Sequence, residues 1–259
     1  MNLVAQMADK GVRMERVEID CPVHGTVSVF QSQIDGQIIR GSCPKCSIEL
    51  SQREDEERTK KIKAQETDPT LMLQKQLSTA GVGEENLFNR FENFDSHSPI
   101  LGEAVSFAKE LAVGYKRYLV MFGTTGVGKT HIAVSAMALA ASQKRSILYT
   151  KEPRLFREIH STYKRKNGPS EDEVYKHFVY PDLLVIDELA TEPLAKHDLM
   201  LLEELIDDRN ASNKATILIS NATKDEYQAH VSDKILSRIA DKGRGATFQI
   251  VEKDWRRRR

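Results

Sequence analysis

The chain has 259 residues, of which 40% are hydrophobic, and its 38 Lys and Arg residues balance its 38 Asp and Glu residues. A chain of this length and composition can bury one large or two smaller cores, and we expect two domains of unequal size. The formal net charge of zero excludes a global field that draws in nucleic acid or an anionic membrane, so such contacts must come from local patches.

The sequence shows no sign of a membrane or export segment. No window approaches 18 consecutive apolar residues, and the first ten residues lack the charged start and long apolar core of a secretory signal. All three cysteines lie between residues 21 and 46, which favours metal binding over disulfides. We therefore expect a soluble, cytoplasmic protein with no membrane contact.

Two short-spaced pairs of metal-binding residue types lie near the N-terminus. The sequence between them alternates like a hairpin over residues 26–30 and 38–40, in the outline of a zinc ribbon. A C-x₂-H and a C-x₂-C pair can close a tetrahedral shell around Zn²⁺, which leaves no position for water and so predicts a structural site. The alternative is three reduced thiols and a surface histidine. The predicted ligands are Cys21, His24, Cys43 and Cys46.

A charged linker follows this module. Residues 51–66 are almost wholly polar with charges spaced for i,i+4 pairing, which predicts an exposed helix or a solvated tether. The short apolar stretch around Leu77 is compatible with a partner-binding helix or with a packed connector. We expect a zinc-binding domain at residues 1–50, a linker at 51–86 and a nucleotide domain at 87–259.

Three phenylalanines, Phe88, Phe91 and Phe94, lie at the entrance to the nucleotide domain, before a helical segment at residues 101–115. They either anchor near an adenine pocket or pack into the core.

A glycine-rich loop follows the apolar run of residues 118–122 and opens a periodic segment at 131–142. In this order of strand, loop and helix, the loop N–H groups can surround phosphate oxygens at a helix N-terminus. Lys129 then reaches the β- and γ-phosphates, and the Thr130 hydroxyl can bind Mg²⁺. The predicted binding residues are Gly123, Thr124, Thr125, Gly126, Val127, Gly128, Lys129 and Thr130.

A second strand is predicted at residues 146–150, followed by helices at 153–163 and 171–178. The basic segment 163–168 between these helices either touches a phosphodiester backbone or is an exposed turn.

A buried parallel strand is predicted at residues 183–186, because four apolar residues lie between Pro181 and two acids. Asp187 at its carboxyl end can hold Mg²⁺ through water, and Glu188 is then placed to polarise an attacking water. A small-molecule kinase does not need the second carboxylate, so the pair favours hydrolysis.

An amphipathic helix at residues 196–210 leads to a strand at 215–220 that ends in Asn221. We expect Asn221 to orient the lytic water or sense the γ-phosphate; the alternative is that it caps the following helix. A helix at 232–242 and a strand at 246–251 complete five βα-type strands of a doubly wound parallel sheet. The arginine-rich end, residues 256–259, either contacts phosphates or is solvated.

These motifs, in this order and spacing, resemble the AAA+ ATPase domain of the DnaC/DnaI helicase loaders. The resemblance covers roughly residues 87–256, and the N-terminal Cys/His module is similar to the zinc-containing adaptor of DnaI-like and phage-encoded members. The motifs that carry it are residues 123–130, 183–188, 216–221, 237–239 and 254–256.

The resemblance implies a P-loop AAA+ ATPase that binds ATP, Mg²⁺ and Zn²⁺, docks on a hexameric replicative helicase of the DnaB type and helps to place it on single-stranded DNA. It implies self-assembly on the helicase, because Arg238 is matched to an arginine finger presented to a neighbouring subunit. Asn221 is matched to sensor 1 and Arg256 to sensor 2. Arg209 or Arg244 could replace Arg238, and the chain ends without room for the usual helical lid.

Two other functions stay open. The first is a transposition helper ATPase of the IstB type, which shares nearly the same motifs but has another partner. The second is a zinc adaptor whose ATP site only stabilises the fold.

Overall fold

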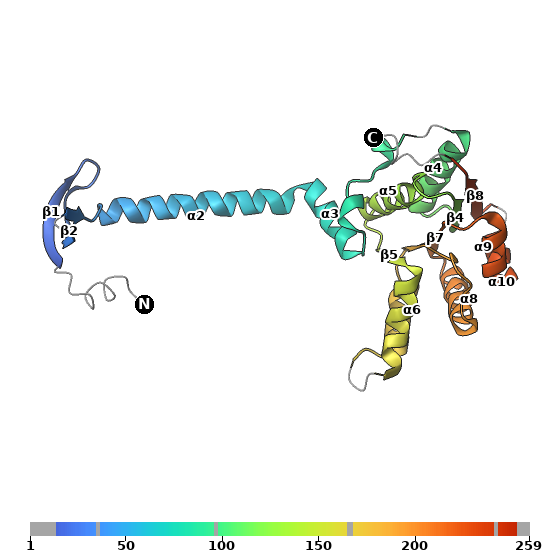
Figure 1. Cartoon of the computed structure of the whole chain (residues 1–259). Helices are drawn as coiled ribbons and strands as arrows, with labels where there is room; N and C mark the ends of the chain where they lie inside the picture. The colour runs from blue at the N-terminus through green and yellow to red at the C-terminus, as the bar shows by residue number, and fades with distance from the viewer. Residues whose placement is uncertain (1–13, 35–36, 96–97, 165–167, 241–242, 253–259) are drawn as a thin grey trace. The chain divides into compact units, whose positions relative to one another are not determined.

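The computed structural model describes residues 14–34, 37–95, 98–164, 168–240 and 243–252 (Figure 1). The chain divides between Asp68 and Pro69 into two compact units. The predicted linker of residues 51–86 spans this division. Within the described residues, no helix is long and apolar enough to cross a membrane.

The first unit is an antiparallel three-stranded sheet followed by one long helix. The two strands expected from the hairpin-like alternation are confirmed, and a third strand precedes them. The strands pair in the order β1-β2-β3. The elements are β1 (Met14–Cys21), β2 (Gly25–Ile34), β3 (Gln37–Arg40) and α2 (Pro44–Thr67).

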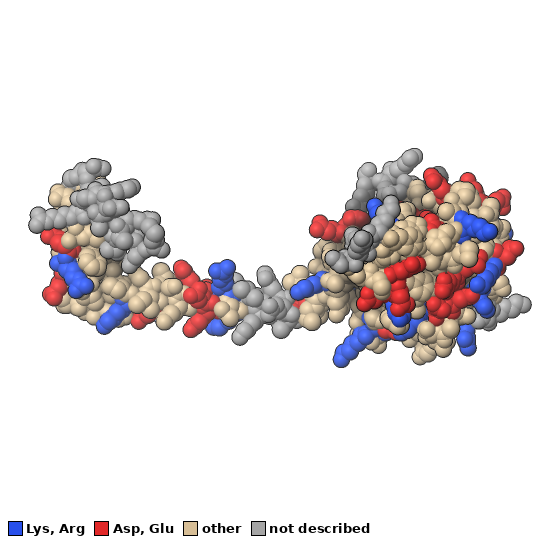
Figure 2. Space-filling model, turned by 90° about the horizontal axis from the view of Figure 1, so that it is seen from below, with Lys and Arg blue, Asp and Glu red and all other residues tan. Residues whose placement is uncertain are grey.

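The helix α2 contains the whole of the predicted charged segment, residues 51–66. Its residues 51–60 are all exposed, and Figure 2 shows acidic and basic side chains along its described part. This helix has little apolar surface to bury, and the sequence places opposite charges one turn apart along it, a spacing at which pairing can stabilise an exposed helix.

The second unit is a five-stranded parallel sheet with helices on both faces, as the sequence predicts. The strands lie in the order β5-β6-β7-β4-β8. Its strands are β4 (Tyr118–Gly123), β5 (Ile147–Lys151), β6 (Leu183–Asp187), β7 (Ala215–Ser220) and β8 (Gly245–Ile250). Its helices are α3 (Pro69–Thr79), α4 (Pro99–Ala112), α5 (Lys129–Ser142), α6 (Glu152–His160), α7 (Glu171–Val179), α8 (Lys196–Ala211), α9 (Lys224–His230) and α10 (Asp233–Ile239). Short 3₁₀ helices are η1 (Glu84–Asn86), η2 (Phe91–Asn93) and η3 (Ser161–Lys164).

Alternate residues of each central strand enter two separate cores. In β4, Leu119 and Met121 join the core under α3, α4 and α5, whereas Val120 and Phe122 join the core under α6 to α10. A strand that is covered on both faces must be apolar at every position, which is why it appears in the sequence as an uninterrupted apolar run.

The apolar stretch before residue 80 is a packed connector. Leu77 of α3 is fully buried in the first of these cores, together with Ala80 and Val82. The N–H of Tyr149 in β5 donates a hydrogen bond of 2.7 Å to the carbonyl oxygen of Ala80. Of the two interpretations of this stretch, the structure therefore supports packing on the nucleotide unit.

Candidate functional site

The glycine-rich loop joins the end of β4 to the start of α5. Gly128 has a φ of 97°, in the left-handed region that favours glycine, and a Cβ there would lie 2.6 Å from the ring of Phe94. A Cβ on Gly123, which has a φ of 127°, would collide with the carbonyl oxygen of Ile250. The loop therefore needs glycine at both positions to pass between β8 and the aromatic segment.

Lys129 lies folded over this loop. Its side-chain ammonium donates hydrogen bonds to the carbonyl oxygens of Gly123 at 2.8 Å and Thr124 at 2.6 Å, and the residue is only 4% exposed. A buried ammonium at the N-terminus of a helix is placed to bind an anion. A phosphate oxygen in the loop can therefore replace these carbonyl contacts.

Asp187 lies beside Thr130, although 57 residues separate them. The Thr130 hydroxyl donates to Oδ2 of Asp187 at 2.9 Å, and the Tyr149 hydroxyl donates to the same oxygen at 2.8 Å. The Glu188 N–H donates to Oδ1 at 2.8 Å. A hydroxyl and a carboxylate, both hard oxygen ligands, thus meet where a magnesium ion bound to a nucleotide in the loop would need them.

Glu188 is held by a basic residue from the neighbouring strand. Nζ of Lys151 lies 2.7 Å from Oε1 of Glu188, and Lys151 stands opposite Asp187 in the pairing of β5 with β6. The hydrogen bond to Glu188 is the main cause that raises the pKa of Lys151. Glu188 itself has a φ of 60°, which costs a residue with a side chain on the order of 1 kcal/mol.

Asn221 follows β7, the strand between β4 and β6, and is exposed. The alternative that Asn221 caps the next helix is wrong, because Thr223 caps α9. The Thr223 hydroxyl accepts a hydrogen bond from the N–H of Glu226 at 3.3 Å, and the Glu226 carboxylate accepts one from the N–H of Thr223 at 2.8 Å. The side chain of Asn221 is therefore not used as the cap.

The three candidates for the arginine finger, Arg209, Arg238 and Arg244, differ in their exposure to solvent. Arg209 is fully buried and donates to the backbone oxygens of Phe178 and Val179 at 2.8 Å each, so it cannot reach a neighbouring subunit. Arg238 on α10 is half exposed and donates to Asp207 of α8 at 2.9 Å. Arg244, in the turn before β8, is exposed.

Arg256 lies outside the described residues. The chain that leads to it passes the glycine-rich loop, because the Thr124 hydroxyl donates to the carbonyl oxygen of Glu252 at 2.9 Å.

Two residues of the aromatic entrance, Phe91 and Phe94, pack against the core, in agreement with the core-packing interpretation. Phe94 also lies beside Gly128, and its ring centroid is 5.0 Å from that of His131. The ring of His131 in turn contacts the carbonyl oxygen of Arg90 at 3.0 Å. Residues 165–167 of the basic segment 163–168 lie outside the described residues. The Tyr163 hydroxyl of this segment contacts a ring nitrogen of His197 at 2.9 Å.

The four predicted metal ligands form one cluster in the first unit. Cys21 ends β1, His24 lies in the turn to β2, and Cys43 and Cys46 lie at the start of α2, with all ligand atoms within 4.8 Å of one another. Nδ1 of His24 lies 3.8, 3.7 and 3.3 Å from the sulfurs of Cys21, Cys43 and Cys46. Zinc bonds of about 2.0 to 2.3 Å in a tetrahedron separate the ligand atoms by about 3.5 to 3.8 Å, so these four residues fit the ion.

Two contacts around the cluster favour metal binding. Backbone hydrogen bonds from Val23 and His24 lower the pKa of Cys21 to about 6, which favours the thiolate that a metal ion binds. The second ring nitrogen of His24, Nε2, lies 3.0 Å from a carboxylate oxygen of Glu49. A carboxylate in this place fixes the orientation of a metal-binding imidazole.

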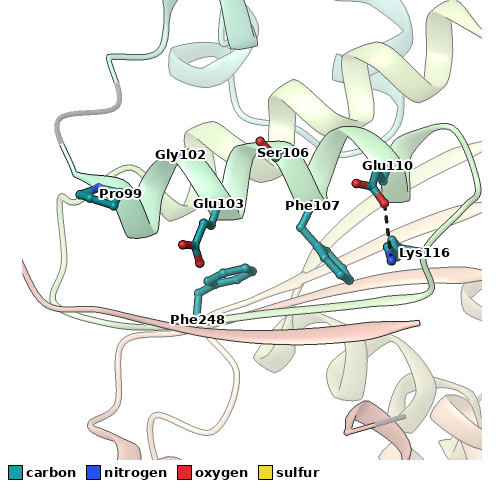
Figure 3. Close-up of a pocket in the computed structure, with 8 residues that line it drawn as sticks. All are labelled: Pro99, Gly102, Glu103, Ser106, Phe107, Glu110, Lys116 and Phe248. Atoms are coloured by element: carbon teal, nitrogen blue, oxygen red, sulfur yellow. Dashed lines mark ion pairs between the residues drawn. The ribbon is translucent and has the colours of Figure 1, made fainter. Parts of the chain in front are cut away.

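A separate open groove of about 530 Å³ lies between α4 and β8 (Figure 3). The side chains of Glu103, Phe107 and Phe248 line it, and Glu110 forms an ion pair of 3.5 Å with Lys116 at one end. None of the site residues predicted from the sequence lines this groove, so it does not belong to the phosphate or metal chemistry described above.

The sequence analysis missed Tyr149, Lys151 and Glu49. The predicted strand at residues 146–150 offered a signal for the first two, because neighbouring parallel strands end at the same edge of the sheet. Glu49 had a weaker signal, since it follows Cys46 by three residues and such a spacing places two side chains on one face of a helix.

Comparison with known proteins agrees with this geometry. The family described as "IstB-like ATP binding protein" matches residues 92–242. The replicative helicase loader DnaC of Buchnera aphidicola subsp. Baizongia pistaciae is 23% identical over 172 residues, which cover 65% of this chain and 70% of that protein. A solved structure described as the DnaC helicase loader matches with a TM-score of 0.56 and 18% identity, over 65% of this chain and 99% of that one.

A solved DNA replication initiation factor matches with a TM-score of 0.56 and 20% identity, over 64% of this chain, which spans only 50% of that protein. At such identities the solved structures show the fold alone, and they agree with the predicted doubly wound parallel sheet of five strands.

Proposed function

The chain belongs to the IstB-like ATP-binding family, and from this premise we propose that it is an ATP-dependent loader that helps to place a hexameric replicative helicase on single-stranded DNA. The observation that carries the ATP part is the contact of 2.9 Å between the Thr130 hydroxyl and Asp187 at the end of the glycine-rich loop. The helicase part is supported by a relative that is named a replicative helicase loader.

In this proposal each site residue has one task. The loop N–H groups and Lys129 bind the phosphates, while Thr130 and Asp187 hold the Mg²⁺ ion, which neutralises charge on the phosphate oxygens. Glu188 orients the attacking water, and Asn221 at the end of the intervening strand contacts that water or the γ-phosphate. Arg256 contacts the nucleotide from the segment beyond Glu252.

Hydrolysis is proposed to be weak in the isolated chain. The carboxylate of Glu188 is occupied by Lys151, and the charge on the transferred phosphoryl group needs a further cation. Arg238 or Arg244 of a neighbouring copy would supply it, since both are accessible whereas Arg209 is not. Self-assembly on the helicase would therefore raise turnover.

The first unit is proposed to hold Zn²⁺ through its Cys₃His cluster and to dock on the helicase. Its sheet exposes large apolar side chains: Phe30 is 47% exposed and Ile39 is 53% exposed. Because Ile39 pairs with Ser32, two residues from Phe30, both side chains lie on the same face of the sheet. Exposed apolar groups on one face of a small sheet are suited to a protein partner.

The test is the mass of the complex formed when the full chain is mixed with a hexameric replicative helicase, with and without ATP. We expect a complex whose formation depends on the first unit, so that Phe30→Ser with Ile39→Ser weakens it. Ile38→Ser, on the opposite face of the same strand, is the matched control and should leave it intact. A helicase that stays a free hexamer in all mixtures contradicts the loader assignment.

The family description favours one second candidate, a helper ATPase of transposition. The two functions share the ATP site and differ in the partner. Co-purification with a transposase instead of a replicative helicase would decide for the helper.

A purely structural ATP site is tested by Glu188→Gln, which should abolish turnover and impair loading if the site acts as an enzyme.

A further inference from the structure

Tyr149 is a buried residue of β5 that contacts the magnesium-binding end of the site. Its ring is packed into the core under α3 and α5, and its hydroxyl donates to Oδ2 of Asp187 at 2.8 Å. We propose that Tyr149 is a positioning residue, which holds the Asp187 carboxylate in the orientation that receives Mg²⁺. This inference rests on the proposed ATP site.

The three hydrogen bonds to the Asp187 carboxylate use three of its four acceptor positions. Each carboxylate oxygen can accept about two hydrogen bonds. Oδ2 already accepts from the hydroxyls of Thr130 and Tyr149, and Oδ1 accepts from the N–H of Glu188. Among these contacts, the remaining acceptor position lies on Oδ1 and would be available to hold Mg²⁺ through water. Thr130, whose proton stays on Oδ2, would offer its own oxygen to the ion.

Tyr149 stays a donor in this arrangement. Burial and, as a smaller cause, the negative charge of Asp187 raise the pKa of Tyr149. The donor role does not depend on this shift, because a phenol with its ordinary pKa of about 10 is already protonated at neutral pH. Without the phenol, Oδ2 regains a free acceptor position and the carboxylate can rotate about its terminal bond, since such torsions have broad energy wells.

The backbone of Tyr149 is fixed from the other side. Its N–H donates to the carbonyl oxygen of Ala80 at 2.7 Å. Gly81, with a φ of 96°, packs so closely that an added Cβ would lie 2.5 Å from the carbonyl oxygen of Tyr149. The segment after α3 therefore holds the edge strand β5, and with it the phenol, in place.

A second tyrosine provides a matched control. The Tyr175 hydroxyl on α7 donates to Oδ2 of Asp208 on α8 at 3.0 Å, so it makes the same kind of bond between elements outside the phosphate site. Burial also raises the pKa of Tyr175. A role that is only structural would make the two tyrosines behave alike.

The experiment measures how ATP binding to the full chain depends on Mg²⁺, for the parent, Tyr149→Phe and Tyr175→Phe. We expect Tyr149→Phe to need about tenfold more Mg²⁺ for half-maximal binding, the loss typical of an outer-shell partner, with unchanged ATP affinity in EDTA. Tyr175→Phe should shift neither quantity. In an Asp187→Asn background, Tyr149→Phe should cause no further shift.

A Tyr149→Phe protein with the Mg²⁺ midpoint of the parent overturns the inference, as does an equal shift in both phenylalanine variants or an additive shift in the Asp187→Asn background. If ATP binding to the parent protein does not respond to Mg²⁺, the proposed ATP site itself is contradicted. This result differs from those that overturn only the role of Tyr149.

Discussion

The ion pair between Lys151 and Glu188 sets the resting position of the carboxylate that we propose orients the attacking water. Both side chains are partly exposed, at 52% and 42%, and such pairs contribute about 0.2 to 1 kcal/mol. Releasing Glu188 should therefore raise the unstimulated rate of ATP hydrolysis by a factor of about two to five in Lys151→Ala. Steady-state turnover without partner protein measures this.

A control for that change is Arg154→Ala, which removes an ion pair of 2.7 Å with Glu158 on α6 and should leave the rate unchanged. A slower Lys151→Ala protein with the ATP affinity of the parent would show that the lysine supports catalysis and does not restrain it.

At the scale of residues, the sequence indicated those candidate site positions that local spacing defines. Lys129 and Thr130 follow directly from the glycine-rich loop, and Asp187 from the end of an apolar run. Local spacing gave only indirect signals for Tyr149, Lys151 and Glu49, because their partners come from the register of β5 on β6 and from the packing of α2. The sequence also could not decide which arginine can reach a neighbouring subunit, because that depends on burial. Only the fold shows that Arg209 is buried and is therefore excluded as a finger.

Among the elements, Asp182 joins the amino ends of three neighbouring strands. Its carboxylate accepts from the N–H and the hydroxyl of Ser146 before β5, at 2.9 and 2.8 Å, and from Lys214 before β7 at 2.7 Å. Burial alone would raise the pKa of Asp182, but the hydrogen bonds from Lys214 and Ser146 outweigh it and lower the pKa to about 2. The ionised form is therefore the one that stabilises the sheet.

The lowered pKa of Asp182 determines how the stability of the protein changes with pH. The folded pKa of about 2 lies below the ordinary value of 3.8, so the stabilisation is present above about pH 4 and is lost as the pH falls towards 2. Asp182→Asn should lower the thermal unfolding midpoint most at pH 5 to 7, and the gap to the parent should close towards pH 2. Asp225→Asn, at an exposed position on α9, is the control; a gap that stays constant with pH contradicts the assignment.

The sequence predicted the strands that are covered on both faces and the helices that have a long amphipathic pattern. The strands β4, β6 and β7 appear as apolar runs because both of their faces are covered. The strand β1 was missed although Val17, Ile19 and Cys21 alternate with charged residues, because a small sheet with exposed faces carries little apolar signal. The start of α2 was also hidden, since Cys46 and the charged segment share one uninterrupted helix.

On the scale of the whole molecule, the two units have different sources of stability. The second has two apolar cores, whereas in the first unit's described part only Cys21, Val29 and Cys43 are buried apolar residues. So small a core needs a metal ion to offset the entropy of folding. We expect one zinc ion per chain by elemental analysis, and loss of β-sheet circular dichroism from the first unit when a chelator removes it.

ATP binding should survive the removal of zinc, because no ligand of the metal lies in the second unit's phosphate site. Cys46→Ser should abolish zinc retention, and His177→Ala, a histidine on α7, should not. Zinc content that is equal in the parent and Cys46→Ser would contradict the Cys₃His assignment.

The central claim is that a nucleotide triphosphate binds in the loop between β4 and α5, and Lys129→Ala tests it most directly. A hydrogen bond from an ammonium to a charged partner contributes about 1.5 to 3 kcal/mol, so the variant should bind ATP about ten to a hundred times more weakly than the parent. Lys196→Ala, at an exposed position on α8, should bind ATP like the parent. A Lys129→Ala protein that keeps the parent's ATP affinity would contradict the account.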